Sequence, residues 1–298
     1  MGSAQGVSGR TSDAGRTASR AIRRFIDHDG TSHTRALAYQ SAFVLLSGFV
    51  GLIGLASVVN WAQLRATVEE QAERLAPGPA AKLLQDAAQH GASGAGTAAF
   101  FGIMAALIAG TLAMAQLERS ANRLSDIDDD RPGLRRYILS FGLVVSAGAL
   151  LVVGGLIVGS GRSIAHGAGL EGAAASAWSI ARWPLGAAIA GTGIFVLYRV
   201  LMPGRPSTRD LVGGALVALV LWVTFTALLG LYLSLSSQSS QTYGPLLAVI
   251  ALLLWSALTS LALHLGIAVI AERSRSAGDR TLRLPDSAAT EPSHVTRP

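Results

Sequence analysis

The chain contains no cysteine, and only 14% of its 298 residues are charged, whereas a soluble domain carries about 25%. Without cysteine, the chain cannot form a disulfide scaffold, a thiolate metal site, a thiol nucleophile or an iron–sulfur cluster. The scarcity of charge, together with 50% hydrophobic residues and 34 glycines, is typical of an integral membrane protein. The composition therefore indicates that the protein lies in a lipid membrane, but it does not indicate an activity.

Long apolar runs predict six transmembrane helices, because each run supplies the roughly 20 residues that a bilayer crossing needs. The runs are Ala36–Asn60, Ala92–Leu117, Tyr137–Gly159, Trp183–Leu201, Leu211–Leu235 and Pro245–Ala271. They are too long and too continuously apolar for the alternating strands of a membrane barrel. The expected fold is an all-α integral membrane protein whose six-helix membrane domain covers residues 36–271.

The distribution of lysine and arginine predicts which way the spans face, since short cytoplasmic loops carry the excess of these residues. Nineteen of the 24 lie before the first span, between spans two and three, between spans four and five, or after the sixth. The opposite side carries only Arg65, Arg74, Lys82, Arg162 and Arg182. We therefore expect both termini in the cytoplasm. The net charge of +6 follows from this topology, so we expect no nucleic-acid partner.

The segments outside the spans divide into three kinds. Residues 1–17 and 272–298 are polar and are expected to be disordered. Residues 18–35 contain a short amphipathic helix, which either lies on the inner leaflet near anionic headgroups or packs on the bundle. The connection Trp61–Gly91 is expected to form two amphipathic helices over the outer side of the bundle.

Prolines and small residues give further local expectations. Pro184 and Pro245 are expected at the starts of the fourth and sixth spans, where a helix tolerates proline. Small residues recur at intervals of three or four, which lets helix backbones approach closely; they are Gly102, Ala106, Gly110, Gly155 and Gly159.

Few polar side chains inside the spans are candidates for a function. His264 is the ionisable residue clearly inside a span, and it can relay a proton, bind an anionic headgroup or simply bond a neighbouring helix. Arg182, at the outer edge, either snorkels to the headgroups or attracts an anionic substrate. Trp222 and Trp255 both reach mid-membrane, away from the interfaces that tryptophan prefers, so they pack inside the bundle or line a cavity.

The sequence offers no residues for catalysis or for a cofactor. The acidic run Asp126–Asp130 lacks the glutamate that an EF-hand needs, because Tyr137 stands at position twelve. We expect this run to balance its neighbours Arg123, Arg131, Arg135 and Arg136. His28 and His33 are a weak metal signal, and phosphate-binding glycine loops and nucleophile elbows are missing. We therefore expect no enzyme, no metal and no cofactor. The lack of a mid-membrane carboxylate also argues against strongly ion-coupled transport.

Three segments carry a resemblance to a known family. The first is the run Ala36-Leu-Ala-Tyr-Gln-Ser-Ala-Phe; the second runs from Glu118-Arg-Ser-Ala-Asn122 through Arg131-Pro132 to Arg136-Tyr137. The third runs from Val212-Gly213-Gly214-Ala215 past Trp222 and Tyr232 to Tyr243-Gly244-Pro245 and Trp255. Together they resemble the YihY/BrkB family of bacterial inner-membrane proteins. The resemblance implies six spans and cytoplasmic termini. Many members have Leu-Gly-Ala-Glu in the last span, where this chain has Leu265-Gly266-Ile267-Ala268; the expected acid is thus absent, with His264 nearby.

The resemblance also bears on function. The family has carried a ribonuclease BN label, but this sequence has no carboxylate cluster that could hold catalytic metals. Some members are associated with serum resistance and with envelope lipid export. We therefore expect a transporter or lipid-handling protein of the cell envelope, or alternatively a scaffold that organises envelope enzymes. Its partners would be membrane lipids, anionic ones among them, and either a second copy or an envelope protein. The candidate substrate or cavity residues are Asn122, Arg131, Arg182, Trp222, Tyr243, Gly244, Trp255 and His264.

Overall fold

The computed structural model describes residues 4–58, 95–127, 133–159, 173–236 and 240–282. All regular structure in these ranges is helical, which confirms the all-α class. The helices are α1 (Ala4–Asp27), α2 (Gly30–Val58), α5 (Ala95–Leu124), α6 (Gly133–Gly159), α8 (Ala173–Leu201), α9 (Thr208–Ser236) and α10 (Ser240–Leu282).

Five of the helices are long and apolar enough to cross a membrane. These spans are Gly30–Leu52, Gly96–Leu124, Ser176–Leu201, Thr208–Leu235 and Val249–Ser276. They correspond to the first, second, fourth, fifth and sixth predicted spans. The third predicted span falls on α6, whose apolar stretch is the shorter Arg136–Leu150. The chain is therefore a multi-pass helical protein, and its sixth span stays a prediction.

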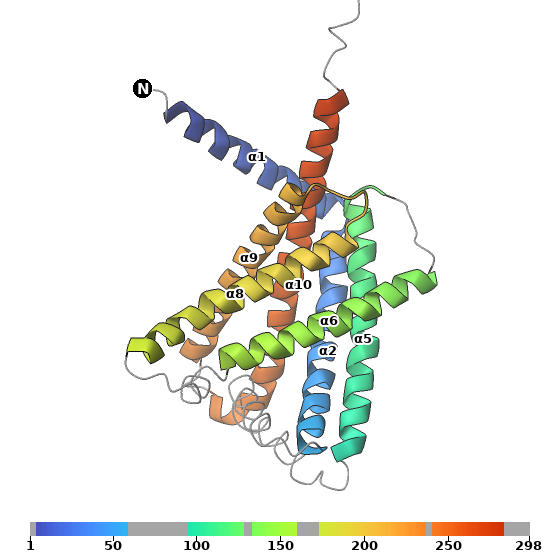
Figure 1. Ribbon diagram of the computed structural model, residues 1–298, viewed down its shortest axis with the longest axis vertical. Coiled ribbons are helices and arrows are strands. Elements are labelled where there is room, and N and C mark those ends of the chain that lie inside the picture. Colours follow the sequence, from blue (N-terminus) through green and yellow to red (C-terminus); the bar gives the residue numbers. More distant parts are fainter. Residues whose placement is uncertain (1–3, 59–94, 128–132, 160–172, 237–239, 283–298) are drawn as a thin grey trace, which may run out of the picture.

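Helix α10 lies at the centre of the bundle and packs against both α9 and α2 (Figure 1). Helix α2 also pairs with α5, whereas α6 and α8 run obliquely across one side. At one end of the bundle, α2 and α9 begin and α5 and α8 finish. We call it the α1 end, because α1 packs there against α10. Ala21 and Phe25 of α1 contact Ala268 and Val269 of α10. The opposite end is called the far end.

Glycines set the closest helix contacts. A Cβ atom at Gly214 of α9 would lie 2.7 Å from the carbonyl oxygen of Gly266 in α10. A Cβ atom at Gly51 of α2 would lie 2.7 Å from the backbone nitrogen of Ile103 in α5, and one at Gly102 would lie 2.9 Å from the carbonyl oxygen of Ser47. Any larger side chain would therefore push these backbones apart. The predicted role of Gly102 as a contact residue is confirmed.

Two helices extend beyond their predicted limits. Helix α1 begins at Ala4, so residues 4–17 are helical where disorder was predicted. Helix α10 continues to Leu282, well past the predicted end of the sixth span at Ala271. In both cases a packed segment supplies the nucleus, and adding residues to an existing helix costs far less than starting one. Residues 283–298 and the connection Trp61–Gly91 lie outside the described residues.

The prolines do not start their helices. Pro184 lies inside α8, which begins at Ala173, so the predicted role of Pro184 as a start residue is wrong. The alanine-rich stretch Ala173–Ala181 has high helix propensity, which outweighs the backbone hydrogen bond lost at the proline. Helix α10 likewise begins at Ser240, one turn before Pro245.

Candidate functional site in the α1 half of the bundle

A stripe of polar side chains runs along the central helix. Ser256, Ser260 and His264 follow one another at intervals of four residues on α10, so they share one face of the helix. Their exposed fractions are 0%, 1% and 0%. The two hydroxyl oxygens and the Nε2 atom of His264 have no hydrogen-bond partner. Each such buried group costs about 1–3 kcal/mol, so the α10 stripe calls for an explanation other than packing.

The other nitrogen of His264 is fixed by the backbone of its own helix. Its Nδ1 atom lies 2.8 Å from the carbonyl oxygen of Ser260. A carbonyl oxygen only accepts hydrogen bonds, so Nδ1 must carry the hydrogen. In the neutral ring, Nε2 then presents a free lone pair. His264 is therefore an unpaired, fully buried acceptor.

A second histidine, His33, lies on α2, which packs against α10. Its Nδ1 atom lies 3.1 Å from the amide nitrogen of Gln116 in α5. The amide oxygen of Gln116 accepts hydrogen bonds from Nη2 and Nε of Arg119, at 2.8 and 3.2 Å. Arg119 thus fixes the orientation of the amide, whose nitrogen donates to His33. The hydrogen of the neutral His33 ring therefore sits on Nε2, which also has no partner.

Two further polar contacts cross between helices in this half of the bundle. Glu118 of α5 and Arg136 of α6, both buried, form an ion pair with 3.6 Å between Oε2 and Nε. The hydroxyl of Tyr198, a fully buried residue of α8, donates a hydrogen bond of 2.7 Å to the carbonyl oxygen of Leu263 in α10. These contacts tie α5 to α6 and α8 to α10. They hold the helices that carry and flank the α10 stripe.

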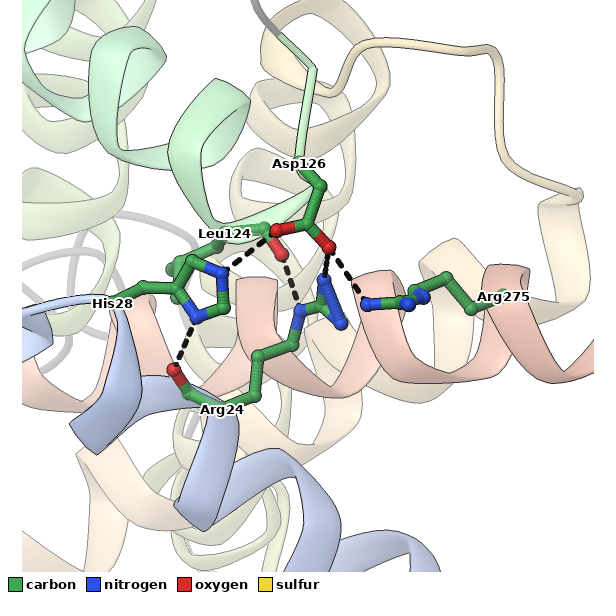
Figure 2. Close-up of polar contacts among 5 residues, drawn as sticks. All are labelled: Arg24, His28, Leu124, Asp126 and Arg275. Carbon is green, nitrogen blue, oxygen red and sulfur yellow. Dashed lines mark hydrogen bonds and ion pairs between the residues drawn. The ribbon is translucent and has the colours of Figure 1, made fainter.

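A separate polar cluster joins three segments at the α1 end (Figure 2). Asp126 lies two residues after the end of α5 and has a φ of 54°, a conformation in which aspartate is enriched. One carboxylate oxygen lies 2.8 Å from Nε2 of His28, and the other accepts from Arg24 and, at 2.7 Å, from Arg275. Arg24 also donates to the carbonyl oxygen of Leu124. Asp126 thereby connects α1, the end of α5 and the extension of α10.

The electrostatics of Asp126 follow from these contacts. Burial raises the pKa of its carboxyl, but hydrogen bonds from His28 and Arg24 and their positive charges outweigh this effect. The pKa of Asp126 therefore lies below its ordinary value. We predicted that this acidic run balances neighbouring arginines such as Arg123. For Asp126 this is incomplete, because three of its partners come from α1 and α10, distant in sequence.

The predicted site residues fall into several places. Trp222 of α9 and Trp255 of α10 pack edge to face with 6.4 Å between ring centroids, and Nε1 of Trp255 donates to the hydroxyl of Thr226 at 3.2 Å. Asn122 is buried near the end of α5. Arg182 lies in the far half of α8, 5.8 Å above the ring of Trp183. Tyr243 and Gly244 lie near the start of α10, where side chains are not described; Arg131 lies outside the described residues.

The sequence interpretation did not identify most of the residues around His264. The interval of four that links Ser256, Ser260 and His264 is visible in the sequence and could have revealed the stripe. By contrast, only tertiary packing brings Gln116 to His33. His28 and His33, considered together as a weak metal signal, belong to two different clusters. Among the residues that the structure describes, no group of three or more His, Asp or Glu side chains could hold a metal ion.

Comparison with known proteins supports the resemblance seen in the sequence. The family model "Virulence factor BrkB" matches residues 21–291. A similar protein from Bacillus subtilis (strain 168), named "Putative ribonuclease-like protein YfkH", is 27% identical over 249 residues, which are 82% of this chain and 90% of the relative. No solved structure matches the chain. Because the family model covers nearly all of the helical part, including the α10 stripe, the chain belongs to the virulence factor BrkB family.

Proposed function

We propose that this protein is a transporter or lipid-handling protein of the bacterial inner membrane, and that a polar part of its substrate reaches the α10 stripe from the α1 end. The observation that carries the proposal is the set of unpaired atoms on Ser256, Ser260 and His264, all fully buried in an apolar helix. Polar groups inside a membrane are costly and mark substrate or ion pathways. Helix packing alone does not require three of them in register.

We place the α1 end in the cytoplasm, with six spans and both termini on that side. The excess of lysine and arginine in the connections at this end supports the orientation. Helix α1 packs on α10 through Ala21 and Phe25, yet Ile22 and Ile26 are 50% and 63% exposed next to the exposed Arg23. One face thus suits the bundle, and the adjoining face suits an anionic inner leaflet.

The other candidate residues fit the same path in the proposal. The Trp222–Trp255 pair is partly exposed and offers an apolar surface along the α9–α10 contact, suited to a lipid chain. Asn122 belongs to the entrance at the α1 end; Arg131, outside the described residues, stays a candidate from the sequence. Tyr243, Gly244 and Arg182 belong to the far end of the path.

The relative's name mentions a ribonuclease, but we propose no nuclease activity. Metal-dependent phosphodiester hydrolysis uses clustered carboxylates. Glu118 is the one buried carboxylate among the described side chains, and it pairs with Arg136.

The alternative function is that of a scaffold without a substrate. The ties among α5, α6, α8 and α10 favour it, because they hold these helices in a fixed arrangement. A scaffold would keep the α10 stripe sealed, and cross-linking would recover a partner protein.

Native mass spectrometry of the protein released in mild detergent separates the two functions. A transporter is expected to retain a specific lipid or envelope precursor, and His264→Ala and Trp222→Ala should lose it while melting nearly as the wild type does. Val249→Ala, on an exposed position of α10, is the control and should keep the ligand. Bulk lipid in proportion to the membrane, whatever the variant, would favour the scaffold.

A further inference from the structure

The ring of His28 lies between two hydrogen-bond acceptors (Figure 2). Its Nδ1 atom is 2.9 Å from the carbonyl oxygen of Arg24, and its Nε2 atom is 2.8 Å from Oδ1 of Asp126. Carbonyl and ionised carboxylate oxygens only accept hydrogen bonds. Each contact therefore requires a hydrogen on the ring nitrogen, and only the positively charged imidazolium carries both hydrogens.

The carboxyl of Asp126 does not supply either hydrogen. Its other oxygen accepts hydrogen bonds from Arg24 and Arg275, which favour the ionised form, and the pKa of Asp126 lies below its ordinary value. In a neutral His28 ring, one nitrogen would turn a bare lone pair towards the Asp126 carboxylate or the Arg24 carbonyl. The neutral ring therefore loses one of its two contacts, whichever tautomer forms.

The charged groups next to His28, in space or in the chain, come from every element that meets at this cluster. They are Arg24 and Asp27 of α1, Asp29 before α2, Asp126 after α5 and Arg275 of α10. The two arginines oppose a positive charge on the ring, and the carboxylates favour it. Carboxylates and guanidinium groups keep their charges between pH 5.5 and 8.5, whereas histidine changes its charge in this range. His28 is thus the member of the cluster that responds to a moderate change of pH.

The position of α1 on the bundle depends on this cluster. His28 directly follows α1, so its bond to Asp126 ties the end of α1 to the end of α5. Along α1, Ala21 and Phe25 are buried against Ala268 and Val269 of α10. Ala268 lies four residues after His264, on the same side of α10. Helix α1 therefore covers the position that continues the α10 stripe towards the α1 end.

We propose that α1 is a pH-sensitive lid over the α1 end of the α10 stripe. The charged His28 ring helps to hold the lid on α10, and loss of its proton loosens the lid. Arg24 keeps its own bonds to Asp126 and Leu124, so the lid opens more often instead of leaving completely. This inference rests on the proposed function, in which a substrate reaches the stripe from this end, and deepens it by naming a regulation.

The first test measures the charge of His28 in the full-length protein in nanodiscs. Nitrogen-15 NMR of histidine-labelled protein at pH 5.5 should show hydrogen on both ring nitrogens of His28. The signals are assigned by their absence from the spectrum of His28→Gln. A His28 ring with hydrogen on only one nitrogen at this pH would overturn the proposal.

The second test measures the opening of α1 by thiol labelling, since the chain has no cysteine of its own. Ala21→Cys reports the buried contact with α10, and Ser19→Cys, at an exposed position of α1, corrects for the effect of pH on thiol reactivity. A buried thiol reacts when the helix lifts, so the ratio of the two rates follows the open fraction. From pH 5.5 to 8.5 this ratio should rise about fivefold, which corresponds to about 1 kcal/mol for one partly exposed charged contact.

Substitutions of histidine show whether His28 causes the response. His28→Arg keeps a positive charge and should give a low ratio at both pH values, whereas the neutral His28→Gln should give a high ratio at both. His33→Gln, outside the cluster, is the matched control and should keep the response. Ala268→Cys, on the other side of the same contact, should respond as Ala21→Cys does. A wild-type ratio that does not change with pH, or a response that persists in His28→Gln, would overturn the proposal.

Labelling of the stripe separates this inference from the proposed function. If α1 is a lid, Ser260→Cys should also react faster from the cytoplasmic side at pH 8.5 than at pH 5.5, relative to Ser19→Cys. Labelling of Ser260→Cys at an equal relative rate at both pH values would overturn the lid and leave the path to the stripe intact. Protection of Ser260→Cys at both pH values, with Ala21→Cys responding, would contradict the path itself and leave only a pH-dependent contact of α1.

Discussion

The two ends of the bundle differ in the side chains that cross between their helices. Towards the α1 end, charged and polar side chains cross from helix to helix: Asp126 joins α1, α5 and α10, Glu118 pairs with Arg136, and Tyr198 bonds the backbone of α10. In the far half, among the described residues, helices meet through glycines such as Gly51 and Gly102, and Trp255 bonds Thr226. These cross-helix contacts pair their polar groups, whereas the hydroxyl oxygens of Ser256 and Ser260 and Nε2 of His264 have no partner. The stripe is not simply one more structural tie.

The largest expected effect is a loss of stability from removing a polar contact in the half of the bundle towards the α1 end. Glu118→Ala removes the carboxylate that forms an ion pair with the buried Arg136, which should destabilise the protein by about 3–5 kcal/mol. Denaturation titrated with sodium dodecyl sulfate measures the loss. The double variant Glu118→Met with Arg136→Leu removes both charges and should recover most of the stability. A double variant no more stable than the single one would contradict this account.

The next largest expected effect is a loss of stability from disturbing a glycine contact in the far half of the bundle. Gly102→Leu forces a side chain against the backbone at Ser47, so α2 and α5 must separate, at a cost of about 1–3 kcal/mol. Gly142→Leu is the matched control, because no atom lies within 4 Å of a Cβ atom there. Its melting temperature should stay near that of the wild type. Equal losses in the two variants would mean that glycine contacts do not hold this half.

A smaller effect, dependent on pH, is expected at Asp126. Because Asp126 is nearly half exposed, Asp126→Asn should cost about 1 kcal/mol. The lowered pKa of Asp126 means that its contribution is complete above the ordinary carboxyl pKa, about 3.9, and is lost as the pH falls through the lower folded value. Thermal melts of wild type and Asp126→Asn should therefore differ at pH 6 and converge in strong acid. A difference that persists there would assign the effect to packing.

The smallest effect concerns the polar contact of the far half. Trp255→Phe removes the indole N–H that bonds Thr226 and should cost about 0.6 kcal/mol, the average for such bonds between membrane helices. Thr226→Val should cost a similar amount, and the double variant little more, when unfolding is measured in the same titration. A fully additive double variant would show that the two side chains act independently.

The sequence predicted the helical class because long apolar runs have few other structures in lipid. It also identified His264 as buried within a span and Gly102 as a contact residue. It could not predict the partners of Asp126, which lie about a hundred residues or more away in the chain. The Gln116–His33 hydrogen bond could not be predicted for the same reason, since neither residue type indicates a partner on another helix.

Helix ends were predicted less well than spans. The known preference of proline for the first turn of a helix favoured Pro184 as a start residue. That preference, however, considers each helix end by itself. Here the alanine-rich segment before Pro184 extends the helix. Likewise, composition predicted disorder before Ala18 because it ignores a packed neighbour that nucleates the helix.

The most direct test of a reachable α10 stripe is substituted-cysteine labelling, since the chain has no cysteine of its own. Ser256→Cys, Ser260→Cys and His264→Cys would be treated in membrane vesicles with a membrane-impermeant thiol reagent from each side. Ala262→Cys, equally buried on α10 but off the stripe, is the matched control. We predict labelling of the stripe from the cytoplasmic side, with Ala262→Cys protected. Protection of all four positions would contradict a path and leave a sealed scaffold.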